Sequence, residues 1–414
     1  MDWVTVAIYL ALILLGWLNI YAVTYDAEAN QSIFSLSLNS GRQLIFIMAS
    51  VVLIIAILII DMRFYETFAY LIFGVLMLIM LLVPFIGKEV GGNKAWIGFG
   101  SFGGQPSEFA KFATALVIAK VISQVGFKLD NLKNQAIVFG IIAIPMALTL
   151  LQKDTGTALV FTVFTLVFFR EGMSPFLIIV AIAAAIISIL TLVVENQLYL
   201  HLSILAILIV AIIAGKKKLK RIVLLIVGAA LVSGVIESVD YVVNNVLAPH
   251  QQSRIKVLVN PDSDPLGAGW NVTQSKIAIG SGGFSGKGFL KGTQTKFDFV
   301  PEQSTDFIFC TIGEEHGWLG SILVVTLFIA LMLRVVFLAE RQKSRFARVY
   351  GYSVACIFFF HFAVNIGMTI GLFPVIGIPL PFLSYGGSSL WGFTILLFIL
   401  LKLDSHRMQV LERG

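Results

Sequence analysis

The sequence predicts an all-α polytopic membrane protein with about twelve transmembrane helices. Of its 414 residues, 58% are hydrophobic and only 13% are charged, whereas soluble domains have about 25% charged residues. Twelve apolar stretches are also long enough, or nearly so, to cross the roughly 30 Å of hydrocarbon in a bilayer. The composition therefore excludes an ordinary soluble domain.

The predicted spans begin close to the N-terminus. The first is too long for the core of a signal peptide and lacks a small-residue cleavage site, so we expect a retained helix. The sixth span is the shortest, and its ends are the least sharply defined by the sequence. In chain order the spans cover about residues 3–24, 42–60, 66–86, 106–123, 135–151, 156–169, 174–194, 198–214, 222–243, 305–333, 349–372 and 387–403.

Basic residues lie in alternating connections, which sets the predicted orientation. They cluster at Gly215–Arg221, Arg341–Arg348 and Gly126–Lys133 and in the C-terminal tail, whereas residues 25–41 contain no Lys or Arg. We therefore expect these connections and both termini on the cytoplasmic side. The net charge of +6 then serves as an insertion signal, because the chain has no soluble basic face of the kind that binds nucleic acid.

Two polar interruptions fall on the predicted external side, at about residues 87–105 and 244–304. Loops beyond about 15 residues are usually functional or disordered. The second interruption contains apolar residues throughout, so we expect short interfacial helices that lie against the bundle. We predict a single transmembrane domain over residues 1–414, with 244–304 as an external loop within it.

The segment QPSEFAK places charged residues at the start of a predicted span. Glu108 and Lys111 are three residues apart and share a helix face. One explanation is a local ion pair that lowers the free-energy cost of inserting the helix into the membrane. The other is that both groups point into a polar cavity, because ionisable residues within spans cost roughly 2.5–3.5 kcal/mol each and tend to be kept for function.

Further charged residues occur in other external segments. LQKDTGTA contains Asp154, although a tight turn with a helix start also explains these residue types. The long loop contains Asp262 and Asp264 within NPDSDPLGAGW, and its later glycines permit close backbone approach and an anion cradle. Separate local ion pairs would explain each segment, but scattered unpaired charges would be costly, so we expect one shared pocket. Its candidate residues are Glu108, Lys111, Asp154, Arg254, Asp264, Lys276 and Asp306.

Nucleotide and transition-metal sites are not indicated. A P-loop ending at Gly286–Lys287 would need glycine at Ser281 and a hydroxyl at Gly288. No paired His or Cys spacing supports a transition metal. The sequence predicts no definite cofactor; if a cation binds, the carboxylate oxygens favour a divalent ion such as Mg²⁺ or Ca²⁺.

Five segments closely resemble the SEDS family of bacterial cell-wall proteins (shape, elongation, division and sporulation). They follow the family's order, cover most of the chain and are more like its elongation members than its division members. The segments are GGNKAWIGFGSFGGQPSEFAK, QKDTGTALVF, NPDSDPLGAGWNVTQSKIAIGSGGFSGKGF, GTQTKFDFVPEQSTDFIFCTIGEEHGWLG and NIGMTIGLFPVIGIPLPFLSYGGSS.

The resemblance implies a peptidoglycan glycosyltransferase that polymerises lipid II, an undecaprenyl-diphosphate-linked disaccharide pentapeptide, outside the bacterial cytoplasmic membrane for cell elongation and shape. It implies a class B penicillin-binding protein and other elongation-complex membrane proteins as partners. The family's essential aspartate falls on Asp264, so 244–304 becomes the expected catalytic loop. Other family motif residues fall on Glu108, Lys111 and Asp154.

The sequence departs from the family in its number of spans. SEDS proteins usually have ten, so the pair near residues 174–214 is interpreted as an insertion into a ten-helix core. An even number of added spans keeps every later connection on its side of the membrane. Asp264 therefore stays external.

We hypothesise that Asp264 takes the proton from the acceptor sugar hydroxyl as it attacks the anomeric carbon of the donor. Positive charge from Arg254, Lys276 or Lys111 would stabilise the departing diphosphate. One alternative is a flippase or transporter of the lipid-linked precursor, because broken spans with buried charges also suit alternating access; another is a scaffold for partner proteins. The predicted substrate-binding residues are Glu108, Lys111, Asp154, Arg254, Lys276 and Asp306.

Overall fold

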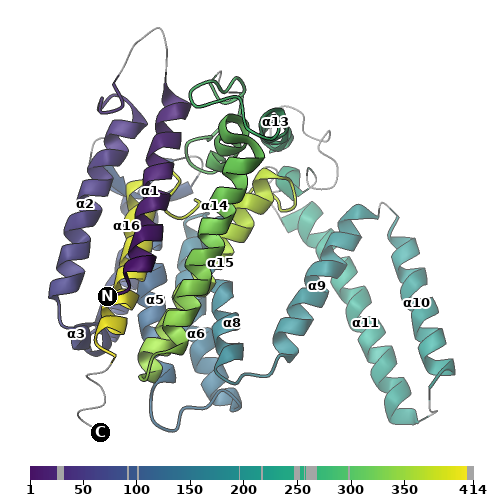
Figure 1. Ribbon diagram of the computed structural model, residues 1–414. Helices are drawn as coiled ribbons and strands as arrows, with labels where there is room; N and C mark the ends of the chain where they lie inside the picture. Colours follow the sequence, from purple (N-terminus) through teal and green to yellow (C-terminus); the bar gives the residue numbers. More distant parts are fainter. Residues whose placement is uncertain are drawn as a thin grey trace. The chain divides into compact units, whose positions relative to one another are not determined.

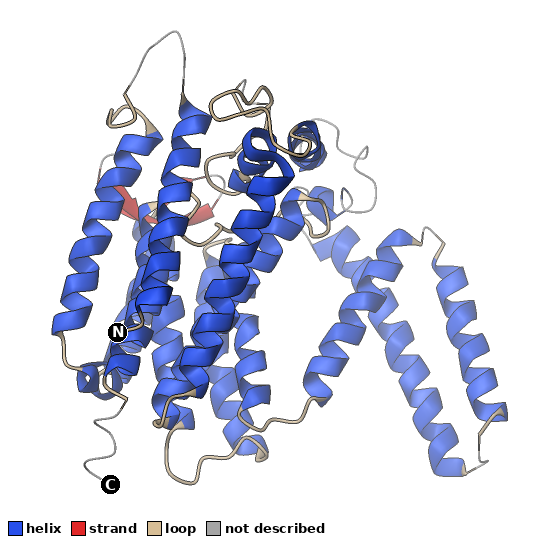
Figure 2. Ribbon diagram, in the orientation of Figure 1, coloured by secondary structure: helices blue, strands red, loops and turns tan. Residues whose placement is uncertain are grey.

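A computed structural model describes residues 1–25, 32–90, 93–99, 102–194, 196–215, 218–246, 252–255, 257, 268–296 and 299–407. Helices dominate these residues (Figures 1 and 2). The helices are α1 (Trp3–Thr24), α2 (Asn39–Ile59), α3 (Met62–Thr67), α4 (Ala69–Ile86), α5 (Pro106–Ile122), α6 (Leu132–Leu151), α7 (Thr155–Val160), the 3₁₀ helix η1 (Phe161–Val163), α8 (Phe164–Arg170), α9 (Phe176–Val193), α10 (Gln197–Ile213), α11 (Leu219–Tyr241), the π-helix η2 (Val242–Val246), α13 (Ala268–Ser281), α14 (Ile308–Glu340), α15 (Arg345–Thr369) and α16 (Gly387–Ser405).

The predicted fold class is confirmed: the chain is an all-α polytopic membrane protein. Within the described residues, nine helices are long and apolar enough to cross a membrane. Two shorter apolar segments, Thr155–Arg170 and Gln197–Ile213, match the predicted sixth and eighth spans. The predicted fourth span is α5, which has 17 residues and carries charged side chains. The total of twelve spans stays a prediction.

The chain divides into two compact units. Unit 1 comprises residues 1–173 and 271–414, and unit 2 comprises residues 174–270. In unit 2, α11 packs against both α9 and α10, which are formed by the residues of the predicted inserted pair. The predicted boundaries, a single domain over 1–414 with a catalytic loop at 244–304, stay a prediction.

Burial separates inner from outer helices in unit 1. The most hydrophobic stretch of α16 is 89% buried and that of α15 is 67% buried, against 17% for α2 and 22% for α4 and α6. Every residue of α5 except Phe109, Phe112 and Lys120 is buried. Because α5 packs against both α15 and α16, these three helices form the interior, and the apolar outer faces of α2, α4 and α6 suit contact with lipid.

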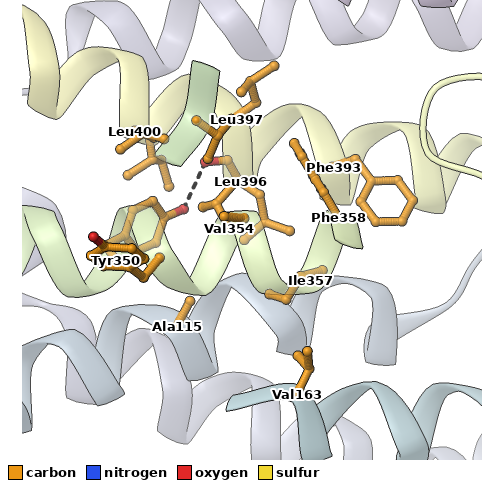
Figure 3. Close-up of a cluster of buried hydrophobic side chains, with 14 of the residues drawn as sticks. Ala115, Val163, Tyr350, Val354, Ile357, Phe358, Phe393, Leu396, Leu397 and Leu400 are labelled. Atoms are coloured by element: carbon orange, nitrogen blue, oxygen red, sulfur yellow. Dashed lines mark hydrogen bonds between the residues drawn. The ribbon is translucent and has the colours of Figure 1, made fainter. Parts of the chain in front are cut away.

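Large apolar side chains fill the space between the inner helices (Figure 3). Phe358 of α15 and Phe393 of α16 pack with their ring centroids 5.9 Å apart in an edge-to-face arrangement, which aromatic pairs prefer. The buried Tyr350 hydroxyl donates a hydrogen bond of 3.2 Å to the Leu396 carbonyl. This bond satisfies a polar group that would otherwise be costly in an apolar core.

The polar interruption at 87–105 contains a small β-sheet that the helical prediction missed. Its strands are β1 (Lys88–Val90), β2 (Asn93–Phe99) and β3 (Phe102–Gly104), antiparallel and in the order β1-β2-β3. Lys94 N–H donates to the Gln152 carbonyl at 3.2 Å, which joins the sheet to the turn after α6. The glycines on both sides of β2 obscure the alternation of side chains by which a strand is recognised.

Helix α14 is kinked at Gly317, whose φ of 62° and ψ of −155° are not helical. The glycine-rich segment that follows α13 pairs with the backbone groups at this kink. Trp318 and Leu319 N–H donate to the carbonyls of Gly283 and Phe284, at 2.9 and 3.2 Å. In return, the N–H groups of residues 287 and 288 donate to the carbonyls of residues 314 and 315, at 3.0 and 2.9 Å. These four hydrogen bonds give partners to the N–H groups of residues 318 and 319 and to the carbonyls of residues 314 and 315.

Close approach explains why this segment is rich in glycine. A Cβ on Gly286 would stand 2.1 Å from the Glu315 carbonyl oxygen, and its φ is +80°. A Cβ on Gly282 would stand 2.0 Å from the Gly313 carbonyl oxygen. These glycines therefore bring the backbone against α14, and the N–H groups of 287 and 288 are used by α14 carbonyls instead of forming the predicted anion cradle.

We expect Gly286→Ala to lower the thermal unfolding midpoint of the purified protein by several degrees, because it adds both the clash and a positive-φ penalty of about 1 kcal/mol. Gly280→Ala is the matched control, since a Cβ there meets no atom within 4 Å. That control should leave the midpoint unchanged or raise it slightly. Equal effects of the two substitutions would contradict this account of the kink.

Candidate active site

The site begins at the first turn of α5. Pro106 occupies the first turn of the helix, where its missing N–H has no partner to lose. One turn later, Lys111 Nζ lies 2.7 Å from Glu108 Oε2, and the two side chains are 0% and 3% exposed. The sequence left a local ion pair and a polar cavity as alternatives. The ion pair is formed, and it is buried in the interior of the bundle.

Lys111 has two further partners from other helices. Its Nζ lies 3.1 Å from Nε2 of His361 on α15 and 4.6 Å from the centroid of the Phe393 ring on α16, within the range of a cation–π interaction. An ammonium group has three N–H donors. A carboxylate, an imidazole and an aromatic face therefore surround the Lys111 ammonium.

Asp154 caps the N-terminus of α7 and ties it to α5. Its carboxylate accepts hydrogen bonds from Thr157 N–H at 3.0 Å and from the Thr157 hydroxyl at 2.8 Å. It also accepts a 2.6 Å hydrogen bond from the Gln105 side-chain amide, the residue directly before α5. The turn-and-cap interpretation of this segment is thus correct, and it also joins two of the predicted site segments.

Asp306 and Lys276 both border the connection between α15 and α16, residues 370–386. The Asp306 carboxylate oxygen Oδ2 lies 3.1 Å from where a Cβ on Gly377 would stand. Lys276 Nζ lies 2.5 Å from the corresponding position on Gly371. The Asp306 carbonyl also accepts a 2.8 Å hydrogen bond from the Asn365 amide of α15. Because Asn365 follows His361 by four residues, one face of α15 contacts both the Asp306 segment and Lys111.

A backbone cradle for an anion does exist, and it holds one of the protein's own carboxylates. Glu314 is fully buried and accepts hydrogen bonds from the N–H groups of residues 293, 294 and 295 at 2.8, 2.9 and 3.0 Å. Lys287 Nζ donates to the same carboxylate at 2.6 Å. Glu315 similarly accepts from Leu290 N–H at 3.1 Å. These two acids organise the segment before α14.

Two predicted site residues are not placed with the others. Asp264 lies outside the described residues, so its predicted position beside Glu108, Lys111 and Asp154 stays a prediction. Arg254 is described within unit 2 and is half-buried. The structure thus places Glu108, Lys111 and Asp154 at the start of α5 and α7, and Asp306 and Lys276 beside the connection 370–386. Their convergence on one pocket and their binding of substrate stay predictions.

Three residues at this site were missed from the sequence. Gln105, His361 and Asn365 make the bonds that join the predicted segments. The sequence FFFHFAVN offered one signal in its histidine, because a polar residue inside a span is costly. Asn365 lies in the same predicted span, 349–372, and offers the same signal. Gln105 stands between Gly104 and Pro106, where polar side chains are common.

The predicted divalent cation stays a prediction. Among the residues that the structure describes, no group of three or more His, Cys, Asp or Glu side chains is placed to hold a metal ion. The buried carboxylates of Glu314 and Glu315 accept the backbone hydrogen bonds described above.

A family model described as cell cycle protein, for FtsW, RodA and SpoVE, matches residues 2–204 and 183–409. The chain belongs to this family. Among FtsW/RodA/SpoVE relatives, it is 32% identical to the peptidoglycan glycosyltransferase RodA of Treponema pallidum, over 98% of each chain. It is 33% identical to the peptidoglycan glycosyltransferase MrdB of Escherichia coli, over 96% of this chain and 92% of that one.

Solved structures share the fold of this FtsW/RodA/SpoVE member. One comes from a study of the structural coordination of polymerization and crosslinking by a peptidoglycan synthase complex; its TM-score is 0.70 at 24% identity, over 99% of this chain and 98% of that one. The rod shape determining protein RodA of Thermus thermophilus gives a TM-score of 0.62 at 22% identity, over 98% and 97% of the two chains.

We expect Lys111→Met to destabilise the protein by about 3–5 kcal/mol, because it leaves the Glu108 carboxylate buried without its counter-ion. The double variant Lys111→Met/Glu108→Gln should recover part of this loss. Lys120→Met is a matched control on the same helix: its pair with Glu66 is 3.9 Å long and 28% and 47% exposed, so it should cost less than about 1 kcal/mol. The free energy of unfolding is measured for the three purified variants. A Lys111→Met protein as stable as Lys120→Met would contradict the prediction.

We expect Asp154→Ala to cost about 1–2 kcal/mol of stability, because the N-terminus of α7 loses its cap. Asp154→Asn should cost less, since an amide oxygen can still accept from Thr157 N–H. Comparing both variants by thermal unfolding checks the capping role. If Asn and Ala are equally destabilising, the charge at position 154 matters more than the cap.

Proposed function

We propose that this chain is a peptidoglycan glycosyltransferase that polymerises lipid II into glycan strands at the outer face of the bacterial cytoplasmic membrane, for cell elongation and shape. Its similarity to RodA of Treponema pallidum, at 32% identity over 98% of both chains, carries this proposal. The relative named MrdB, also a peptidoglycan glycosyltransferase, supports it over 96% of the chain. The alternation of basic connections supports a cytoplasmic position for both termini and an external position for residues 244–304.

The proposed reaction uses Asp264 as general base. Its carboxylate takes the proton from the acceptor sugar hydroxyl, and the freed oxygen attacks the anomeric carbon of the donor. The bond between that carbon and the diphosphate breaks, and the lipid diphosphate leaves with its electrons. Charge that develops on the leaving group is stabilised by cationic side chains, for which Arg254 and Lys276 are the candidates.

Lys111 contributes differently. Because its ammonium is buried and engaged by Glu108, His361 and Phe393, it acts on charge in the site through its field rather than as a free donor. A preorganised charge of this kind needs no rearrangement during the reaction. Asp306 and Lys276 flank the connection 370–386, whose Pro379 carbonyl bonds to His361, and are proposed to contact the substrate's polar part.

A penicillin-binding protein of class B is the proposed partner, together with other membrane proteins of an elongation complex. The fold shared with a component of a peptidoglycan synthase complex supports this pairing. Cross-linking by such a partner would use the glycan strand as it is made. A divalent cation such as Mg²⁺ is proposed to assist the leaving diphosphate, since phosphate oxygens favour such ions.

We expect Asp264→Ala to lower the rate of polymerisation of labelled lipid II by about 10²–10⁴-fold, the usual contribution of one general base. The variant should remain membrane-inserted and folded. Asp262→Ala is the control two residues away and should retain turnover. Gel analysis of glycan strands, with and without the penicillin-binding partner, provides the measurement. Normal turnover by Asp264→Ala would contradict the base, and a wild-type protein that translocates lipid II without polymerising it would favour a flippase.

A further inference from the structure

His361 is a buried histidine whose two ring nitrogens bond to partners distant in the sequence. It lies in the middle of α15 and is 1% exposed. Nδ1 lies 3.0 Å from the Pro379 carbonyl oxygen, and Nε2 lies 3.1 Å from Lys111 Nζ. A histidine that only fills a core would not need two such partners on different elements.

The partners settle which nitrogen carries the proton. A carbonyl oxygen can only accept, so Nδ1 carries the hydrogen and donates it to Pro379. Nε2 is then left with its lone pair, which faces the Lys111 ammonium. A doubly protonated ring would place two donors against each other at that contact. His361 is therefore the neutral Nδ1–H tautomer, and it accepts a hydrogen bond from Lys111.

The same helix face also holds the connection 370–386. Asn365, one turn after His361, donates to the Ile378 carbonyl at 2.8 Å and to the Asp306 carbonyl at 2.8 Å. His361 holds the next carbonyl, that of Pro379. A proline lacks an N–H, so this stretch relies on side chains for part of its hydrogen bonding. One imidazole ring thus bonds both the connection and the Lys111 ammonium.

We propose that His361 is a positioning residue for the glycosyl transfer: it orients the Lys111 ammonium by accepting its hydrogen bond while Pro379 fixes the ring. This inference rests on the proposed glycosyltransferase function. Glu108 lies on the same helix as Lys111 and fixes one direction of the ammonium, and the imidazole fixes a second direction from α15. Misplacement of a catalytic charge by about 1 Å can cost about 100-fold in rate.

Two substitutions separate the two ring nitrogens. In His361→Gln, the longer side chain can place its amide oxygen near the position of Nε2 and keep an acceptor for Lys111. In His361→Asn, the shorter amide can keep the donor to Pro379 but does not reach Lys111. His201→Asn is a control for the loss of a histidine elsewhere, since His201 pairs with Glu237 within unit 2.

The experiment measures lipid II polymerisation by the full-length variants together with the penicillin-binding partner, alongside thermal unfolding. We expect kcat of His361→Asn to fall about 10- to 100-fold with KM within about twofold of the wild type. His361→Gln should stay within about threefold of the wild-type kcat, and His201→Asn should match the wild type.

Several results would overturn the inference. A fully active His361→Asn protein shows that the acceptor is not needed, and equal losses in His361→Asn and His361→Gln show that the acceptor is not what matters. An unfolded His361→Asn protein beside a folded, active His361→Gln protein assigns the contact to stability instead of positioning. A wild-type protein that makes no polymer under any of these conditions overturns the proposed function itself.

Discussion

An ammonium group inside a membrane-embedded helix bundle is the constraint on which the rest of this structure depends. A charge without partners there would be too costly to keep, and Lys111 has no exposure to solvent. Its partners come from α5, the helix that carries it, and from α15 and α16. These three helices are also the most buried ones in unit 1. Pairing the charge therefore requires the same arrangement that apolar packing produces around Phe358 and Phe393.

Backbone hydrogen bonding imposes a second constraint, because buried backbone polar groups need hydrogen-bond partners. Three departures from regular helix are satisfied in this way. The kink at Gly317 pairs with the glycine-rich segment after α13, the segment at 293–295 pairs with the Glu314 carboxylate, and the connection 370–386 pairs with His361 and Asn365. All three are adjacent to α14 or α15. Backbone groups at the kink, and polar or charged side chains in the other two cases, thus replace the hydrogen bonds that water would otherwise make.

The site joins these two constraints. Segments that carry the predicted substrate-binding residues are tied to one another by neutral amides and an imidazole: Gln105 bonds Asp154, Asn365 bonds the Asp306 segment, and His361 bonds Lys111. Neutral side chains can donate and accept without adding a charge to the interior. They hold the charged groups at fixed positions, and fixed charges are what electrostatic stabilisation of a leaving group requires.

Local sequence determined the spans, the helix start at Pro106 and the pairing of Glu108 with Lys111, because apolar length and i,i+3 spacing act within one element. The family resemblance indicated Asp264 as the essential aspartate, and this residue lies outside the described residues. Only the tertiary structure decided the partners of Lys111 on α15 and α16, the bond from Gln105 to Asp154, and the use of the loop glycines against α14. These contacts join residues far apart in the chain, for example Lys111 and His361, which are 250 positions apart. No spacing rule specifies them, since they depend on which helix faces pack together in three dimensions.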